Sequence, residues 1–297
     1  MINILDTASV GYPLVRHGIG LFPVYVHQLL DRTISVGGED VTVTEVGGGE
    51  VPVLRVSNPL PVPVLLPEGE TLIGGRQNRV LNVSVLVPAG SSTDVPVSCV
   101  EAGRWNEGEC FDRANWKATR RVRRTMVAGV GQNLRQRNWK GADQGQVWSA
   151  IEQELHRFDA NNPTAALHEV RGAGLAGPAA AATEELVSAG PLPQQNGLVM
   201  SRGSRIIGAE IFATPELLES SWESIVRSVM LEADDRYSRP SPTRALRFLH
   251  RLATGESHTA NGVGLGQEVH VRTDRLVGQA LVWDDVLVHA SAFAIAA

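Results

Sequence analysis

The chain has 297 residues, of which 43% are hydrophobic, 20% charged and 5% aromatic, and its 27 basic and 32 acidic residues give a net charge of −5. This apolar content excludes an intrinsically disordered chain, and two cysteines are too few for a disulfide-stabilised scaffold. The mild acidity argues against a protein that binds nucleic acid over its whole surface.

The chain carries no predicted targeting or membrane segment. Its first residues lack the basic start and apolar core of a signal peptide, and no apolar run approaches the roughly 18 residues that span a bilayer. We therefore expect a cytoplasmic protein with no membrane partner. Cys99 and Cys110 are expected to be reduced thiols, with a disulfide between them as the less favoured alternative.

Residues 1–110 are predicted to be rich in β-strands. Short runs of Val, Leu and Ile alternate there with Gly, Pro and Asn, which is typical of a sandwich or a barrel. The expected strands are Val41–Val46, a run from Val53, Val62–Leu66, Val80–Val87 and Thr93–Val100.

Residues 111–171 form a predicted helical segment. A polar, basic helix is expected from Asp112 to Val130, and a second helix from Gln144 to Phe158. In the second helix the apolar side chains recur at the spacing of one helical face, namely Val147, Trp148, Ile151, Leu155 and Phe158.

The rest of the chain divides into a connection and a mixed part. Residues 172–197, rich in Gly, Ala, Pro and Gln, predict a flexible loop or linker with a short helix at 183–188. Residues 198–297 predict an α+β part. Its expected elements are a hairpin over 198–212, helices that begin at Thr214-Pro215 and Ser241-Pro242, and strands over 268–272, 276–283 and 286–293.

The fold class that these elements predict is α+β. It comprises an N-terminal sandwich or barrel-like part, central helices, and C-terminal hairpins packed with two helices, within one integrated domain from about residue 20 to 297. The two C-terminal hairpins could pair in one sheet. The boundaries of these parts follow the changes in composition and periodicity along the chain.

Most catalytic and cofactor motifs are absent from the sequence. There is no P-loop, no His-Glu-x-x-His, no Cys-x-x-Cys and no Gly-x-Ser-x-Gly, so neither a metal site nor a cofactor is predicted. The Gly262-Val-Gly-Leu-Gly run precedes a strand and predicts a turn rather than a phosphate loop. His168 and His289 are interpreted as surface or satisfied core residues.

The segment 68–79 is the first candidate site. Gly74 and Gly75 let the backbone turn or approach a ligand, and Arg76, Gln77, Asn78 and Arg79 follow as a dense set of hydrogen-bond donors. Guanidinium groups bind phosphate or carboxylate, and amides can bind a ribose or a base edge. The alternative is a β-turn whose arginines pair with Glu68 and Glu70.

The segment 96–105 is the second candidate site. Cys99 shares a strand face with valines, which favours a small core residue over a nucleophile. Glu101, Arg104 and Trp105 follow at the end of the strand, where they could line a pocket for a ring and a sugar. They could equally form a salt bridge that an aromatic side chain covers.

The stretch 113–140 concentrates positive charge. It holds nine basic residues and no acidic ones, so the remainder of the chain has 18 basic and 32 acidic residues. With four nearby tryptophans it could bind phosphates and stack bases. The favoured alternative is a solvated helix face, or a face paired with the acidic remainder of the chain in a homo-oligomer.

Several of these strings resemble one known family. Gly74-Gly-Arg-Gln-Asn-Arg, Ser98-Cys-Val-Glu-Ala-Gly-Arg-Trp and Arg205-Ile-Ile-Gly-Ala-Glu-Ile-Phe are similar to segments of the ARG-and-Rhodanese-Phosphatase-superfamily-associated protein domain, where ARG stands for ADP-ribosylglycohydrolase. The resemblance spans residues 50 to 295. It implies a role around ADP-ribose or NAD-derived metabolites and supplies no catalytic residues.

Together these observations predict a protein that binds an ADP-ribose- or NAD-derived, phosphate-bearing small molecule, with enzymatic processing left open. The predicted ligand-binding residues are Gly74, Gly75, Arg76, Gln77, Asn78, Arg79, Glu101, Arg104 and Trp105. If there is catalysis, Glu68, Glu70 or Glu101 would be the general base. The alternatives are a non-enzymatic interaction or assembly protein that uses the basic 113–140 surface, and a nucleic-acid-binding module.

Overall fold

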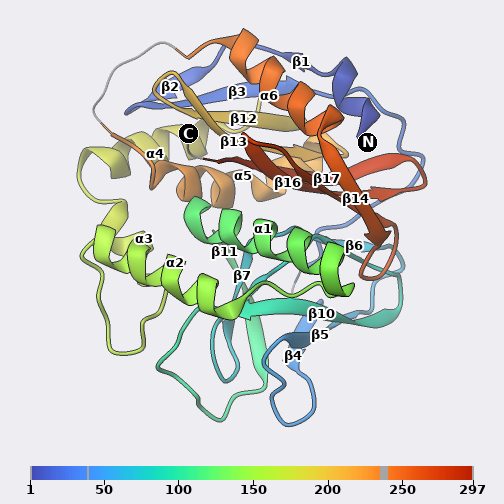
Figure 1. Cartoon of the computed structure of the whole chain (residues 1–297), viewed down its shortest axis with the longest axis vertical. Coiled ribbons are helices and arrows are strands. Elements are labelled where there is room, and N and C mark those ends of the chain that lie inside the picture. Colours follow the sequence, from blue (N-terminus) through green and yellow to red (C-terminus); the bar gives the residue numbers. More distant parts are fainter. Residues whose placement is uncertain (1, 39, 235–239, 296–297) are drawn as a thin grey trace. The chain divides into compact units, whose positions relative to one another are not determined.

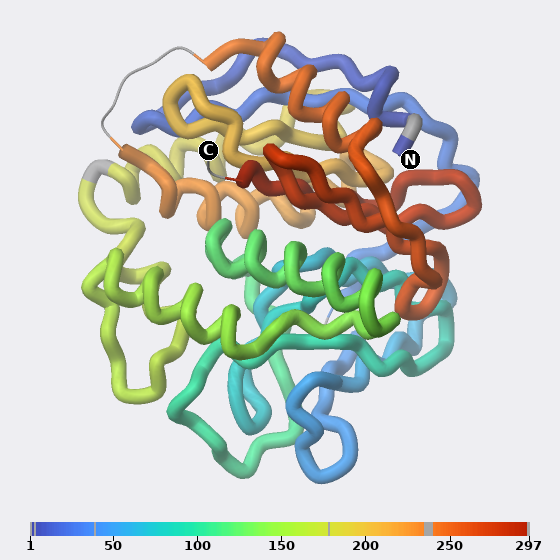
Figure 2. The backbone as a smooth tube through the Cα atoms, viewed as in Figure 1, coloured from blue at the N-terminus to red at the C-terminus, as the bar shows by residue number. Residues whose placement is uncertain are grey.

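A computed structural model of the chain describes residues 2–38, 40–234 and 240–295 (Figure 1). The chain divides into two compact units, each made of segments that are distant in sequence. The first unit comprises Met1–Asp31, Leu175–Thr259 and Glu268–Ala297, and the second comprises Arg32–Gly174 and Ala260–Gln267. The path of the chain through both units can be followed by colour in Figure 2.

The second unit is built on a closed six-stranded antiparallel barrel. Its strands follow the order β10 (Ser91–Cys99), β5 (Val53–Asn58), β4 (Thr42–Glu45), β11 (Cys110–Lys117), β7 (Glu70–Gly74) and β8 (Arg79–Leu81), and β8 pairs with β10 to close it. A separate pair, β6 (Val64–Leu66) and β9 (Val85–Val87), belongs to the same unit, as do α1 (Arg120–Arg137), α2 (Gln144–Arg157) and α3 (Glu169–Gly174).

The inside of the barrel follows from strand register. Leu54 alternates with exposed Arg55 on β5, so Leu54 faces inward. Leu54 pairs with Val95, which lies on the same face as Cys99, and Cys99 pairs with Arg79. Residues that pair directly share a face of the sheet, so Arg79 also projects into the barrel.

The first unit is a nine-stranded antiparallel sheet with helices. The strand order is β1 (Ser9–Val10), β3 (Ile19–Tyr25), β12 (Gly197–Arg202), β13 (Arg205–Phe212), β17 (Val286–Ala294), β16 (Leu276–Trp283), β15 (Gln267–Arg272) and β14 (Glu256–Asn261), and β2 (Leu14–Arg16) also pairs with β3. The helical elements are η1 (Asn3–Thr7), α4 (Pro178–Ala189), α5 (Pro215–Met230) and α6 (Pro242–Thr254).

The core of the first unit confirms the predicted stripe of α6. Ala245, Phe248, Leu249 and Leu252 belong to one apolar cluster with strand residues such as Ile211. Local signals were sufficient for this helix and for α5, because each begins with a proline in its first turn and buries one regular stripe. The predicted pairing of the two C-terminal hairpins is also confirmed, since β13 pairs with β17.

Other strand positions of the same sheet carry buried polar side chains. Glu210 on β13 pairs in register with Ser291 on β17, which pairs with Gln279 on β16, and all three are buried. His289 lies two residues from Ser291, and its Nε2 is 2.9 Å from a carboxylate oxygen of Glu210. This buried polar row carries no local sequence signal, because each of its residues is isolated in an otherwise apolar strand.

The helix predicted from Asp112 to Val130 is wrong in its first part. Residues 110–117 form β11, which pairs with β4 and β7 and so closes one side of the barrel. The helix begins only at Arg120, after Thr119 accepts a hydrogen bond from the backbone N–H of Val122. Pairing on both edges of the strand therefore overrides the helical composition of the segment.

Two further differences concern connections. Strand β7 occupies part of the segment 68–79, for which a β-turn was the alternative interpretation. Helix α4 spans twelve residues within 172–197, where only a short helix was expected. Cys99 and Cys110 are both free thiols, as predicted. No helix within the described part of the chain is long and apolar enough to cross a membrane.

Candidate anion-binding site

The turn between β7 and β8 depends on its two glycines. Gly74 and Gly75 have φ angles of +129° and +49°. A Cβ atom on Gly74 would lie 2.5 Å from the carbonyl oxygen of Cys110, and one on Gly75 would lie 2.1 Å from the ring of Phe111. The glycines thus allow the turn to pack tightly over the mouth of the barrel.

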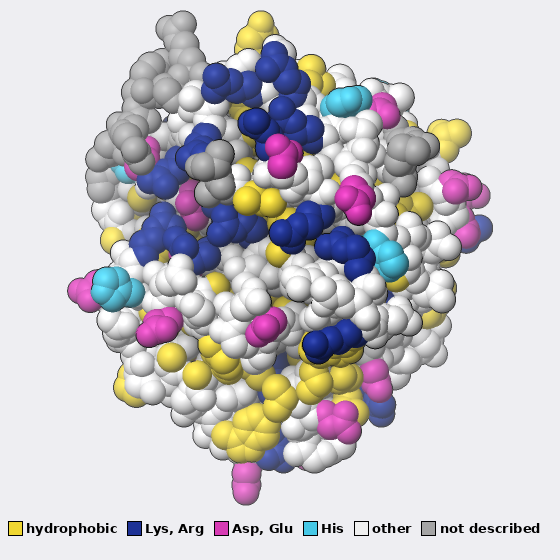
Figure 3. All heavy atoms as spheres, in the orientation of Figure 1, with side chains coloured by type: hydrophobic (Ala, Val, Ile, Leu, Met, Phe, Trp, Pro, Cys, Tyr) yellow, Lys and Arg dark blue, Asp and Glu magenta, His cyan; other side chains and the backbone are white. Residues whose placement is uncertain are grey.

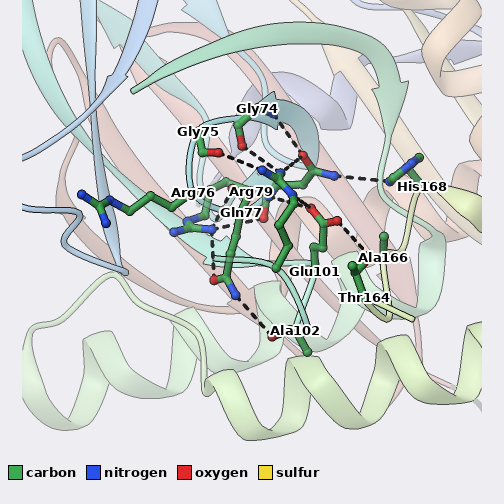
Figure 4. Close-up of polar contacts among 12 residues, drawn as sticks. Gly74, Gly75, Arg76, Gln77, Arg79, Glu101, Ala102, Thr164, Ala166 and His168 are labelled. Carbon is green, nitrogen blue, oxygen red and sulfur yellow. Dashed lines mark hydrogen bonds and ion pairs between the residues drawn. The ribbon is translucent and has the colours of Figure 1, made fainter. Parts of the chain in front are cut away.

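Arg104 fixes this turn from the adjacent segment. Its guanidinium donates to the carbonyl oxygens of Gly75 at 2.8 Å and Gly74 at 3.0 Å, to Oδ1 of Asn78 at 2.9 Å and to Glu101 at 2.7 Å (Figure 4). One guanidinium therefore satisfies four acceptors on two segments that are distant in sequence. The segments 68–79 and 96–105 do meet in space.

Glu101 completes this network. One carboxylate oxygen accepts from Arg104 and from the backbone N–H of Asn78 at 3.3 Å, and the other accepts from Oγ1 of Thr164 at 2.9 Å. Because Oδ1 of Asn78 already accepts two hydrogen bonds, its amide nitrogen is the donor to Nδ1 of His168 at 3.3 Å. His168 therefore accepts at Nδ1 and carries its proton on Nε2.

Arg79 is completely buried inside the barrel. Its Nη1 donates to the carbonyl oxygen of Gln77 at 2.8 Å, whereas its Nε and Nη2 have no hydrogen-bond partner among the residues that the structure describes. Burial lowers the pKa of the guanidinium below its ordinary value, and the nearby Cys99 thiol and Glu45 carboxylate act in the opposite direction. Burial also raises the pKa of the Cys99 thiol, as expected for a core cysteine.

Arg76 differs from the other polar residues of the turn. Its backbone N–H donates to Oε1 of Glu45 at 2.9 Å, but its side chain extends away from the network (Figure 4). The guanidinium carbon lies 5.5 Å from the centroid of the Trp105 ring, which is a cation–π arrangement. No carboxylate of a described residue pairs with it. Trp105 is 50% exposed.

Glu68 and Glu70 lie outside this network. Glu68 is buried, and its carboxylate accepts hydrogen bonds from Nε and Nη2 of Arg123 at 3.2 and 2.6 Å. The Glu70 carboxylate accepts hydrogen bonds from Nε and Nη2 of Arg113 in the same way. The alternative interpretation, in which Arg76 and Arg79 pair with these two glutamates, is therefore wrong, because both carboxylates pair with arginines of the basic stretch. Neither faces the turn as a base.

Three arginines of the basic stretch 113–140 form ion pairs with carboxylates of their own unit. The third of these arginines, Arg121, pairs with Glu154 at 2.7 Å, and Lys140 donates to the carbonyl oxygen of Asn261. Paired cations attract external polyanions less than free ones do. Figure 3 shows Lys and Arg side chains from the whole chain in dark blue, and several of them lie on the face in view.

Three members of the site were not predicted from the sequence. Glu45 ends the short strand β4, Thr164 lies in the connection after α2, and His168 was interpreted only as a surface or core residue. No local signal identifies them, because each reaches the site only through the tertiary fold. No cluster of three or more metal-binding side chains occurs among the residues that the structure describes.

Comparison with known proteins identifies the family. The chain matches the ARG and Rhodanese-Phosphatase-superfamily-associated Protein domain over residues 7–293. The comparisons with curated proteins and with solved structures found no match. The match covers nearly the whole length of the chain, so the chain belongs to this family, as the resemblance predicted.

Proposed function

We propose that this protein binds a phosphate-bearing, nucleotide-derived small molecule of the ADP-ribose or NAD type at Arg76 and Trp105. The observation that carries the proposal is that Arg76 keeps a guanidinium without a carboxylate partner, stacked on a half-exposed indole. A free guanidinium can bind a phosphate, and the open face of the indole can stack on a base. The family name, which links the domain to ADP-ribosylglycohydrolases, supports this ligand class.

The surrounding network supports a preorganised site. The backbone of the turn is held by hydrogen bonds from or to the side chains of Arg104, Glu101, Arg79 and Glu45, so Arg76 is presented on a fixed turn. Such preorganisation lowers the cost of ordering on binding. The three candidate bases are engaged in ion pairs, so we propose binding and assign no reaction. The free thiols agree with the expected cytoplasmic location.

Isothermal titration calorimetry with ADP-ribose, NAD, ADP and ribose 5-phosphate tests this proposal. Replacing Arg76 with Ala removes a charged hydrogen-bond donor, which is worth about 1.5–3 kcal/mol and corresponds to roughly 10- to 150-fold in affinity. Trp105→Ala should weaken the binding of the nucleotides by about 1–3 kcal/mol, the contribution of base stacking, and should leave the binding of ribose 5-phosphate nearly unchanged.

Trp139→Ala is the matched control, because Trp139 is similarly exposed, at 46%, but lies in the basic stretch. It should bind every ligand as the wild type does. Absence of heat with all four ligands in folded protein contradicts the proposal. An equal loss of affinity in the Trp105 and Trp139 variants would also contradict the assigned position of the site.

A further inference from the structure

Arg79 presents an unused binding edge. The Nε and Nη2 atoms of an arginine lie on the same side of the guanidinium and form a fork that matches a carboxylate or phosphate. Three other arginines of the same unit use this fork to hold a carboxylate through both oxygens, namely Arg55 with Asp94, Arg113 with Glu70 and Arg123 with Glu68. In Arg79 the same two nitrogens have no partner.

Burying Nε and Nη2 of Arg79 without hydrogen-bond partners among the described residues costs free energy. Arg79 has no exposed surface, so water cannot satisfy its nitrogens as it would on the outside of the protein. Glu45 projects into the same end of the barrel, and one of its carboxylate oxygens, Oε2, is also buried without a hydrogen-bond partner. Glu45 forms no ion pair with Arg79, and its other oxygen, Oε1, is committed to the backbone of Arg76.

Gln77 is the side chain that lies over Arg79 at the turn (Figure 4). Its Oε1 accepts from Nη1 of Arg79 at 3.3 Å, and its Nε2 donates to the carbonyl oxygen of Ala102 at 3.4 Å. Both distances are beyond the usual range for N–H···O bonds, so little free energy holds the amide in place. Gln77 is 8% exposed, contacts Nη1 of Arg79 and directly follows Arg76 in the chain.

We propose that Arg79 is an inner oxyanion subsite, closed in this structure by the amide of Gln77, and that a carboxylate or phosphate group displaces this amide to bind the Nε/Nη2 fork. The displacement breaks two long hydrogen bonds of the Gln77 amide, only one of which involves a charged group, and forms two hydrogen bonds between opposite charges, which are stronger. The subsite lies in the barrel, beneath the turn that carries Arg76, and its link to the same ligand rests on the proposed function. The fork, however, recognises an oxyanion whatever molecule carries it.

The substitution Gln77→Glu tests this inference without any ligand. It places a carboxylate where an amide oxygen already lies 3.3 Å from Arg79, so the protein supplies its own oxyanion. We expect the melting temperature of the full chain to rise by about 2–4 °C at neutral pH, the shift that one good ion pair gives in a chain of this class. Gln77→Met, which removes the amide without adding charge, should not raise it.

The pH dependence of the stability of the Gln77→Glu variant is a second, independent test. Pairing with Arg79 depresses the pKa of the new carboxyl in the folded state, so the added stability is present above the ordinary glutamate pKa and disappears as the pH falls through the folded value. A melting temperature below that of the wild type at neutral pH would overturn the inference, because it would show that the interior rejects an anion.

Titration with inorganic phosphate and with acetate, at constant ionic strength, tests ligand entry. In Gln77→Ala the amide no longer competes, so phosphate or acetate should raise the melting temperature at concentrations at least threefold lower than in the wild type. In Gln77→Glu the specific increment should vanish, and any residual increment reports the general salt effect. Comparison of the two anions shows which oxyanion the fork prefers.

Equal increments in the wild type, Gln77→Ala and Gln77→Glu would overturn the inner subsite. That result would leave the outer site untouched, because the nucleotide titrations are evaluated on Arg76→Ala and Trp105→Ala. Conversely, loss of nucleotide binding with a stabilised Gln77→Glu variant would remove the proposed function and retain the oxyanion subsite. The two proposals can therefore fail separately.

Discussion

Removing Arg104 should loosen the turn that carries Arg76. In Arg104→Ala, Glu101 loses its ion pair, and the carbonyl oxygens of Gly74 and Gly75 lose their donor. The Glu101 side chain is 6% exposed in the unsubstituted protein, so the substitution leaves a largely buried carboxylate without its counter-ion. The perturbation therefore affects the scaffold of the site and leaves the Arg76–Trp105 pair chemically intact.

The magnitude follows from the burial of the two partners. Breaking a fully buried ion pair by removing one partner costs about 3–5 kcal/mol. The Arg104 side chain is 20% exposed, so water can enter and partly solvate the acceptors left behind. We therefore expect Arg104→Ala to lower the free energy of unfolding by about 2–4 kcal/mol, below the fully buried limit.

Equilibrium urea unfolding of the full chain measures this loss, and a double-mutant cycle assigns it. Glu101→Gln in the Arg104→Ala background removes the uncompensated charge while keeping an acceptor for Thr164, so the double variant should be more stable than Arg104→Ala alone by about 1 kcal/mol or more. Arg55→Ala is the matched control: its ion pair with Asp94 is half-exposed on both sides and should contribute only about 0–1 kcal/mol.

A loss in Arg104→Ala no larger than that in Arg55→Ala would refute this reasoning. Additive effects of the Arg104 and Glu101 substitutions would refute it as well, because independent residues show no coupling free energy. The same variants then provide a test of preorganisation. Arg104→Ala should weaken ligand binding through disorder of the turn even though it removes no group that we assign to the ligand.

Gly75→Ala should destabilise the protein by about 2–4 kcal/mol in thermal or urea unfolding, because its Cβ would collide with the Phe111 ring at a positive φ. Gly90→Ala also has a positive φ but meets no atom within 4 Å, so it should cost only about 1 kcal/mol, and equal losses would show that the collision is irrelevant. Iodoacetamide should label Cys110 and spare Cys99 in the folded protein, since Cys99 is buried and its thiol pKa is raised. Mass spectrometry of the native protein would contradict this if two adducts formed at similar rates.

The sequence by itself determined the elements whose signals are local. Helices α5 and α6 were predicted from a Ser or Thr before a proline and from one buried stripe, and the C-terminal hairpins from alternating strands around short turns. It also indicated the two segments that form the candidate site, because Gly74-Gly-Arg-Gln-Asn-Arg and the run ending at Trp105 combine turn residues with charged hydrogen-bond donors.

Only the tertiary structure decided what each of those residues does. Barrel closure pairs β8 with β10 and so joins Glu101 and Arg104 to Asn78, which makes three of the predicted ligand contacts part of the scaffold. The same closure buries Arg79 and leaves Arg76 stacked on Trp105 outside. Ion pairs also join residues that are distant in the chain, as Glu68 and Arg123 are, 55 residues apart. This ion pair gives Glu68, a candidate base, a structural role. Local propensity is set by neighbours in the chain, whereas burial and pairing are set by neighbours in space. The sequence could therefore indicate the candidate site, but it could not distinguish Arg76, to which we assign the ligand, from the arginines that support the turn.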